Sequence, residues 1–312
     1  MLILESQDFS EEVIRGLRKW ATVDLGMPAG QNLLQVLARY DVCWFRLAHR
    51  IDERVLTEQS RCRVLVTPVT GIDHIDEQLC VRLGVKIICL RGEVEFLKEI
   101  RATAEMTLGL ALALMRHIPQ ASTSVLAGEW DRDRFRGHEL YRKTAGIIGL
   151  GRLGEITAGY FHTMGMNVIA YDPHRTSMPP HIVAVGSLEA LAAKADLISL
   201  HVNYRPETHG LIGNHFFQYV KPSAFLINTS RGGIIDEHAL LVALKEKRLA
   251  GAALDVLIGE PDIEANPLVA YARRHDNLLI VPHIGGNTYE SFAKTESFMA
   301  KRLQEYWNSI EA

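Results

Sequence analysis

The glycine-rich segment at residues 149–154 constrains the fold of this chain more than any other feature. Its residues are Gly149, Leu150, Gly151, Arg152, Leu153 and Gly154. It lies between an apolar run, 145–148, and an amphipathic stretch that continues to Met164. Asp172 follows the next apolar run, 18 residues beyond the last glycine. A glycine-rich turn between a strand and a helix, with an acid at the end of the second strand, predicts a dinucleotide-binding βαβ unit.

Each glycine has a physical role in such a unit. Gly149 permits a tight turn, Gly151 lets backbone N–H groups approach a pyrophosphate, and Gly154 allows the helix and strand to pack closely. The phosphates would rest on the positive end of the helix. Asp172 can accept hydrogen bonds from the adenosine ribose hydroxyls, and its charge repels a 2′-phosphate. The segment therefore favours NAD over NADP, although Arg175 is near enough in sequence to weaken that repulsion.

Apolar runs separated by helical patterns recur along the whole chain, which predicts an α/β fold with parallel sheets. The strands expected from these runs lie within 2–4, 41–47, 64–68, 85–90, 145–148, 167–171, 196–200, 224–228, 252–256 and 278–281. We expect two Rossmann-like or flavodoxin-like domains with doubly wound parallel sheets and a cleft between them, the second sheet having six strands. The apolar stretch from Arg101 predicts a helix buried between two layers.

The domain boundaries follow from where the pattern changes. An amphipathic helix from Tyr289 to Ile310 is expected to return to the first domain. The first, substrate-binding domain would thus be discontinuous, with residues 1–98 and 289–312, and the NAD-binding domain would be 99–288. We expect no regulatory domain after Ala312.

Composition excludes several classes of protein. At 312 residues with 47% hydrophobic content, the chain can fill about two domains. Its net charge of −3 gives no general attraction to nucleic acid or anionic membranes. Four scattered cysteines favour reduced thiols over a disulfide or zinc framework, and no metal is expected. The N-terminus lacks a signal-peptide pattern and no apolar run could span a bilayer, so we expect a cytoplasmic protein.

Three polar residues follow predicted strands and form the candidate catalytic group. Arg231 comes after the run 224–228, and the glycines that follow it suggest a backbone shaped around a bound group. Glu260 follows 252–256, and His283 follows Leu278–Val281 and Pro282. A surface arginine, a solvated glutamate and a turn histidine are the alternatives. Together, Arg231 could hold a carboxylate and Glu260 could orient the His283 imidazole and favour its protonated form.

The sequence resembles the D-isomer-specific 2-hydroxyacid dehydrogenases over nearly its whole length. The matching segments are TGIDHID at 70–76, TAEMTLGLALAL at 103–114, GIIGLGRLG at 146–154, KPSAFLINTSRGGIIDE at 221–237, LDV at 254–256, GEP at 259–261 and VPHIGGNT at 281–288. Some residues depart from the family pattern: Asn203 stands where proline is usual after His201, Arg142 replaces a glycine, and Thr70 replaces the lysine of phosphite-oxidising relatives.

The resemblance implies a role for each candidate residue. Arg231 would anchor the carboxylate of a 2-oxo acid and polarise its keto group, with help from backbone amides at Thr70 and Gly71. His283 would donate its proton to the keto oxygen, and Glu260 would keep that proton available. The residues implied in NAD binding are Gly149, Gly151, Arg152, Leu153, Gly154, Asp172, His201, Thr229, Ser230, Asp255 and Gly285.

The resemblance leaves the substrate open. Arg46 matches roughly the position from which phosphoglycerate dehydrogenases reach the substrate phosphate, which favours D-3-phosphoglycerate, and Arg91 or Arg101 could add charge. The alternative is that Arg46 pairs with a local carboxylate such as Asp73 or Glu105. In that case hydroxypyruvate or glyoxylate would be the substrate. The negative carboxylate of Glu99 would also repel a substrate phosphate.

The resemblance also implies a homodimer, with the arm at 127–144 as the expected contact. A different class of function, an NADH-sensing binding protein, shares this fold. Such a protein could tolerate loss of Arg231, Glu260 or His283, and all three are present.

Overall fold

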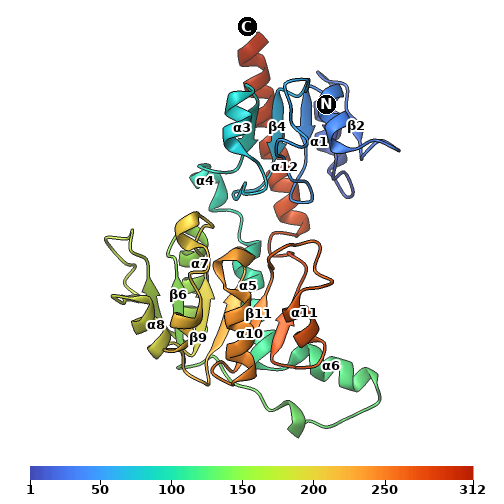
Figure 1. The fold of residues 1–312 in the computed structure, drawn as a ribbon. Coiled ribbons are helices and arrows are strands. Elements are labelled where there is room, and N and C mark those ends of the chain that lie inside the picture. The colour runs from blue at the N-terminus through green and yellow to red at the C-terminus, as the bar shows by residue number, and fades with distance from the viewer. Residues whose placement is uncertain (312) are drawn as a thin grey trace. The chain divides into compact units, whose positions relative to one another are not determined.

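A computed structural model describes residues 1–311, which form two compact units (Figure 1). Unit 1 comprises Met1–Ile100 and the segment that begins at Thr288, so it contains both the blue and the red ends of the ribbon in Figure 1. Unit 2 comprises Arg101–Asn287. The boundaries expected from sequence, 98/99 and 288/289, lie within two residues of these.

Unit 1 contains a five-stranded parallel sheet in the order β2-β1-β3-β4-β5. Its strands are β1 (Leu2–Ile3), β2 (Asp24–Leu25), β3 (Val42–Trp44), β4 (Val64–Thr67) and β5 (Lys86–Cys89). This is the flavodoxin-like order, in which the winding reverses between β1 and β3. Strand β2 was not expected, because its two exposed residues carry no apolar pattern of their own.

Helices cover both faces of the unit 1 sheet. They are α1 (Glu11–Leu17), α2 (Leu33–Arg39), α3 (Glu77–Arg82), α4 (Val94–Leu97) and α12 (Tyr289–Glu311). Successive residues of a strand point to opposite faces. Val64 and Val66 accordingly pack with α1 and α12, whereas Leu65 packs with α2 and α3. The helix expected at Tyr289–Ile310 is therefore part of the unit 1 core.

Unit 2 contains a seven-stranded parallel sheet in the order β12-β11-β10-β9-β6-β7-β8. Its strands are β6 (Thr144–Ile148), β7 (Asn167–Tyr171), β8 (Ile182–Ala184), β9 (Leu197–Leu200), β10 (Phe225–Asn228), β11 (Gly251–Leu254) and β12 (Leu278–Ile280). This is the Rossmann order with one added strand, and the winding reverses between β6 and β9. The expected count of six was wrong, because β8 is a short edge strand whose last two residues are exposed.

Helices also cover both faces of the unit 2 sheet, so both sheets are doubly wound as expected. They are α5 (Ala102–Met115), α6 (Ile118–Leu126), α7 (Arg152–Thr163), α8 (Leu188–Lys194), α9 (Asn214–Phe217), α10 (Glu237–Lys245) and α11 (Pro267–Ala272), with short 3₁₀ turns at Asp133–Phe135, Pro206–Thr208 and Gly232–Ile234. Helices α5 and α7 share one core, and α8 to α11 share the other.

Helix α5 differs from its prediction. It packs on β10 and β11, but Glu105 and Gly109 are exposed, so it belongs to one outer layer and is not buried between two. No helix within residues 1–311 combines the length and the apolar character needed to cross a membrane.

Candidate active site and dinucleotide turn

The carboxyl ends of β10, β11 and β12 bring the three candidate catalytic residues to one edge of the unit 2 sheet. These strands are neighbours and run parallel. Arg231 follows β10, Glu260 follows β11 and His283 follows β12. Ligands of open parallel sheets bind at this edge.

Glu260 and His283 form a direct hydrogen bond, with 2.6 Å between Nδ1 of the imidazole and Oε1 of the carboxylate. An ionised carboxylate only accepts hydrogen bonds, so this contact assigns a proton to Nδ1. The other ring nitrogen, Nε2, is then the one that can exchange a proton with a ligand. The second oxygen of Glu260 accepts from the Leu257 amide at 3.2 Å, which fixes the carboxylate. Both side chains are partly accessible, His283 at 24% and Glu260 at 33%.

Asp255 positions the backbone around His283. The residue is buried, and its carboxylate accepts from the amides of Ile284 at 2.6 Å and Gly285 at 2.8 Å. Its carbonyl oxygen accepts from the His283 amide at 2.8 Å. Burial raises the pKa of Asp255, and the two amide hydrogen bonds oppose that rise. Both oxygens of the Asp255 carboxylate thus hold the histidine loop, in addition to the role in NAD binding that the resemblance implies.

Gly285 is required by this close approach. A Cβ atom there would lie 2.7 Å from Oδ2 of Asp255. His283 itself adopts φ +53°, a left-handed conformation that is unfavourable for a residue with a side chain. The three hydrogen bonds to Asp255 hold it there.

The Arg231 loop is organised by Asn228, a fully buried residue that sequence reasoning did not select. The Asn228 amide group donates to the Arg231 carbonyl at 2.9 Å and accepts from the Ser230 amide at 3.0 Å. The Arg231 guanidinium donates to the Ser230 carbonyl at 2.9 Å. The sequence does contain a sign of this role, because Asn228 is a polar residue at the end of an otherwise apolar strand.

The two glycines after Arg231 pack closely against other parts of the protein. A Cβ atom on Gly232 would lie 2.2 Å from the Leu257 carbonyl carbon, and one on Gly233 would lie 2.6 Å from the Tyr204 ring. The Arg231 loop therefore lies directly on the loop that leads to Glu260.

Thr229 and Ser230 use their hydroxyl groups within the protein. Thr229 Oγ1 lies 2.8 Å from Thr107 Oγ1 on α5, and Ser230 Oγ donates to the Leu200 carbonyl at 2.6 Å. Both hydroxyl groups therefore hold the loop in place. The backbone atoms of Thr229 and Ser230 are then the main groups that could contact the cofactor.

The glycine-rich turn has the geometry that its sequence predicted. Gly149 adopts φ +85°, and a Cβ atom there would lie 2.7 Å from the His201 carbonyl. A Cβ atom on Gly154 would lie 2.1 Å from the Gly149 carbonyl. A Cβ atom on Gly151, in contrast, would meet no described atom of residues 1–311 within 4 Å. The turn is thus tightly packed on the protein side and open at Gly151, which fits the close approach of a pyrophosphate to the start of α7.

The remaining residues implied in cofactor binding surround this turn. Arg152 and Leu153 begin α7 and are half-buried. His201 follows β9, and its Nε2 lies 2.8 Å from Ser199 Oγ. Burial lowers the pKa of His201 to about 4, so the ring is neutral at physiological pH.

Asp172 lies at the end of β7, where a ribose-binding acid is expected. Its Oδ2 accepts from the Leu150 amide at 2.8 Å and its Oδ1 from the His174 amide at 2.9 Å. Arg175, which could have softened the repulsion of a 2′-phosphate, forms an ion pair with Glu155 on α7. That pairing partly offsets the positive charge of Arg175 beside Asp172, and the acid at the end of β7 fits the ribose of NAD.

The substrate-binding residues expected in unit 1 follow neighbouring strands. Thr70 and Gly71 come after β4, with Thr70 exposed. Arg46 comes after β3 and is engaged in an ion pair with Glu296 of α12. The expectation that Arg46 pairs with a local carboxylate, Asp73 or Glu105, was wrong. Its partner Glu296 lies 250 residues away in sequence. Because its guanidinium group already pairs with a carboxylate, Arg46 is less suited to bind a substrate phosphate.

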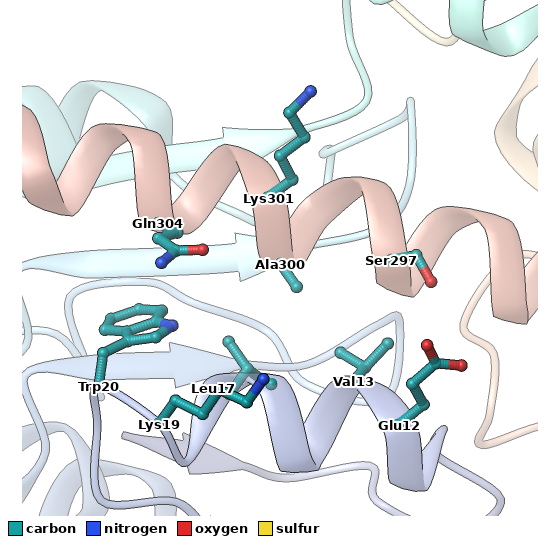
Figure 2. Close-up of a pocket in the computed structure, with 10 residues that line it drawn as sticks. Glu12, Val13, Leu17, Lys19, Trp20, Ser297, Ala300, Lys301 and Gln304 are labelled. Carbon is teal, nitrogen blue, oxygen red and sulfur yellow. The ribbon is translucent and has the colours of Figure 1, made fainter.

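A groove of about 430 Å³ lies between α1 and α12 of unit 1 (Figure 2). Val13, Leu17 and Ala300 point into it, and Trp20 lies at one end. It contains none of the candidate catalytic or cofactor residues. Within residues 1–311, no three His, Cys, Asp or Glu side chains are grouped to hold a metal ion.

Comparison with known proteins identifies relatives of the whole chain. Residues 108–285 match the family described as D-isomer specific 2-hydroxyacid dehydrogenase, NAD binding domain. D-3-phosphoglycerate dehydrogenase of Methanocaldococcus jannaschii is 34% identical over 307 residues, covering 97% of this chain and 57% of the relative. Glyoxylate reductase of Thermofilum pendens is 33% identical, covering 88% of this chain and 81% of the relative.

Several solved structures share the fold of this chain. An acyclic imino acid reductase in complex with NADPH and D-Arg aligns with a TM-score of 0.83 and 26% identity, over 99% of this chain and 98% of that one. The chain spans only about half the length of the phosphoglycerate dehydrogenases that it matches.

Proposed function

Because this chain belongs to the family of D-isomer-specific 2-hydroxyacid dehydrogenases, we propose that it is an NAD-dependent oxidoreductase acting on the CH–OH group of a 2-hydroxy acid. The observation that carries the proposal is the Glu260–His283 hydrogen bond of 2.6 Å at the carboxyl edge of the unit 2 sheet. The dinucleotide turn at Gly149–Gly154 leaves the same edge of that sheet. A proton donor and a cofactor turn are the two parts that this reaction requires.

In the proposed mechanism each residue acts on one part of the substrate. Arg231 binds the substrate carboxylate through its guanidinium group, because a planar guanidinium can donate two parallel hydrogen bonds to a carboxylate. His283 donates the proton on Nε2 to the keto oxygen during reduction and takes it back during oxidation. Glu260 keeps the imidazole oriented through Nδ1. NAD held at the dinucleotide turn would supply the hydride-transfer chemistry at C2 of the substrate.

The dinucleotide turn and Asp172 would hold the cofactor. The open side of Gly151 accommodates the pyrophosphate, and Asp172 takes the ribose hydroxyls. Exclusion of NADP rests on two features, the charge of Asp172 and the pairing of Arg175 with Glu155. Since a structural relative binds NADPH, we expect this preference to be set by those local charges and not by the fold.

Two substrates are candidates. The relative from Methanocaldococcus jannaschii supports D-3-phosphoglycerate, as expected from sequence. The pairing of Arg46 with Glu296 favours the second candidate, an unphosphorylated acid such as hydroxypyruvate or glyoxylate, and the Thermofilum pendens relative supports it. We also propose a homodimer and a cytoplasmic location, the latter in keeping with four free thiols.

The test is a steady-state assay with NADH against phosphohydroxypyruvate, hydroxypyruvate, glyoxylate, pyruvate and 2-oxoglutarate. Turnover of at least one of them, consuming NADH in equal amounts, supports the proposed reaction. NADH binding without turnover of any 2-oxo acid would instead favour a binding protein that senses NADH. Repeating the assay with NADPH measures the cofactor preference, and a higher kcat/KM with NADPH would contradict the role of Asp172.

A further inference from the structure

The switch point of the unit 1 sheet is filled by a charged network. The winding of this sheet reverses between β1 and β3, which is the place where open parallel sheets bind ligands. Glu5 follows β1 and Arg46 follows β3. Oε1 of Glu5 accepts from the Arg46 amide at 3.0 Å and from the Ala48 amide at 3.2 Å. The Glu5 carboxylate thus fixes the loop that carries Arg46.

Helix α12 supplies the partners of the Arg46 guanidinium. Glu296 forms an ion pair with it through Oε1, and its other oxygen, Oε2, accepts from the Ser10 amide at 2.9 Å. Phe292, one turn earlier on the helix, lies under the guanidinium with its ring centre 3.8 Å from the Arg46 Cζ atom. The Arg46 side chain is 14% exposed and that of Glu296 only 1%. Arg46 is therefore neutralised and stacked by groups of its own unit.

Glu296 has the chemistry of a bound anion. It places a carboxylate on an arginine at the edge of the sheet where open parallel sheets bind ligands. A phosphate brought to Arg46 would have to displace the Glu296 carboxylate or lie beside it, and like charges at such short distances repel. Displacement would leave a buried carboxylate without its cation, which is strongly unfavourable.

We propose that Glu296 is a specificity-determining residue, which occupies Arg46 and thereby excludes substrates that carry a phosphate. This inference rests on the proposed function, since it concerns which 2-oxo acid is reduced. Thr70 and Gly71, which are implied in binding the carboxylate that all 2-oxo acids share, follow the adjacent strand β4 at the same edge. The wild-type enzyme then acts on unphosphorylated acids.

The experiment compares phosphohydroxypyruvate with hydroxypyruvate, a pair that differs only in the phosphate. We expect wild-type kcat/KM to favour hydroxypyruvate by about tenfold or more. Glu296→Gln should raise kcat/KM for phosphohydroxypyruvate about tenfold, mainly through KM, and change that for hydroxypyruvate less than about threefold. The double variant R46Q/E296Q should lose the gain. Glu305→Gln, which removes an exposed carboxylate from the same helix, is the control for net charge and should change neither value.

Binding of inorganic phosphate, measured by calorimetry, separates this inference from the proposed reaction. E296Q should bind phosphate about tenfold more tightly than wild type even if no 2-oxo acid is turned over. A wild-type preference for phosphohydroxypyruvate overturns the proposal, and so does an unchanged phosphate affinity in folded E296Q. Should E296Q fail to fold, Glu296→Asp keeps the charge but withdraws it by one methylene. The same gain, smaller in size, is expected from that variant, and its absence also overturns the proposal.

Discussion

At the scale of single residues, His283 combines a chemical role with an unfavourable backbone. Its φ of +53° is a conformation that asparagine, aspartate and histidine adopt several-fold more readily than other residues with a side chain, and asparagine can also hydrogen-bond locally there. The structure therefore provides a way to separate the chemistry of the imidazole from the cost of its position.

His283→Asn removes the proton donor but suits the left-handed backbone. We expect kcat/KM to fall by about 10²–10⁴ because general acid catalysis is lost, while thermal stability stays equal or rises. His283→Ala should lose activity to the same extent and be about 1 kcal/mol less stable than H283N. Steady-state kinetics and thermal unfolding measure both effects. Wild-type turnover in H283N would remove His283 from the mechanism.

His201 makes a prediction about stability and pH. Burial lowers its pKa in the folded protein to about 4, against 6.5 for an exposed histidine. Above pH 6.5 both states are neutral, so the residue has no effect. Between pH 6.5 and 4 the unfolded chain binds a proton that the folded chain does not, so stability falls as the pH falls.

Replacing His201 should remove this loss. Between pH 7 and pH 4.5, wild type should lose about 2–3 kcal/mol more free energy of unfolding than His201→Gln. Urea unfolding at the two pH values measures the difference. Equal losses in the two proteins would show that His201 becomes protonated in the folded state.

At the scale of elements, helix α7 contains a matched pair of glycines. A Cβ atom on Gly154 would lie 2.1 Å from the Gly149 carbonyl, whereas one on Gly159 would meet no described atom within 4 Å outside its own helix. Gly154→Ala should destabilise the protein by about 2–3 kcal/mol and weaken NADH binding, since the turn must open. Gly159→Ala should stabilise it by about 0.5–1 kcal/mol, because alanine favours a helix. Urea unfolding and NADH titration of both variants test this, and equal effects would contradict close packing at Gly154.

Local patterns predicted most elements, and pairing between distant segments decided the rest. Strand β7 has the predicted bounds, because its apolar run is long enough to show where it begins and ends. Strands β2 and β8 were not predicted because they are short and largely exposed. They are strands because they pair with β1 and β7, respectively, which local sequence does not indicate.

The candidate site divides in the same way. Arg231, Glu260 and His283 were predictable as a group, since neighbouring parallel strands end at one edge. Which groups the Asp255 carboxylate would bind was not, because that depends on the conformation of the loop after β12. Glu296 is 250 residues from Arg46, and nothing local in sequence indicates that pair.

At the scale of the whole molecule, the proposed dimer makes a prediction about exposed apolar residues. Leu126 and Trp130 are each 86% exposed, at and near the end of α6, and Tyr141 is 59% exposed. Large exposed aromatic and apolar groups are enriched at contact surfaces between proteins. We expect wild type to sediment at about twice the 34.9 kDa of one chain.

Leu126→Asp with Trp130→Asp should give a monomer in the same sedimentation experiment. Val183→Asp, at a site on β8 that is 64% exposed, is the matched control and should remain a dimer. A single-chain mass for wild type, or a dimer that survives the double substitution, would reject this contact.

The discontinuity of unit 1 sets the order in which the chain can mature on a ribosome. Residues 1–100 emerge first, yet Met299 and Leu303 of α12 are fully buried in their core. Those residues are made only after the whole of Arg101–Asn287. At about 5–20 residues per second, that wait lasts on the order of 10–40 s. Unit 2 can complete its core meanwhile, so residues 1–100 reach their native state only after the later unit has formed, when α12 arrives.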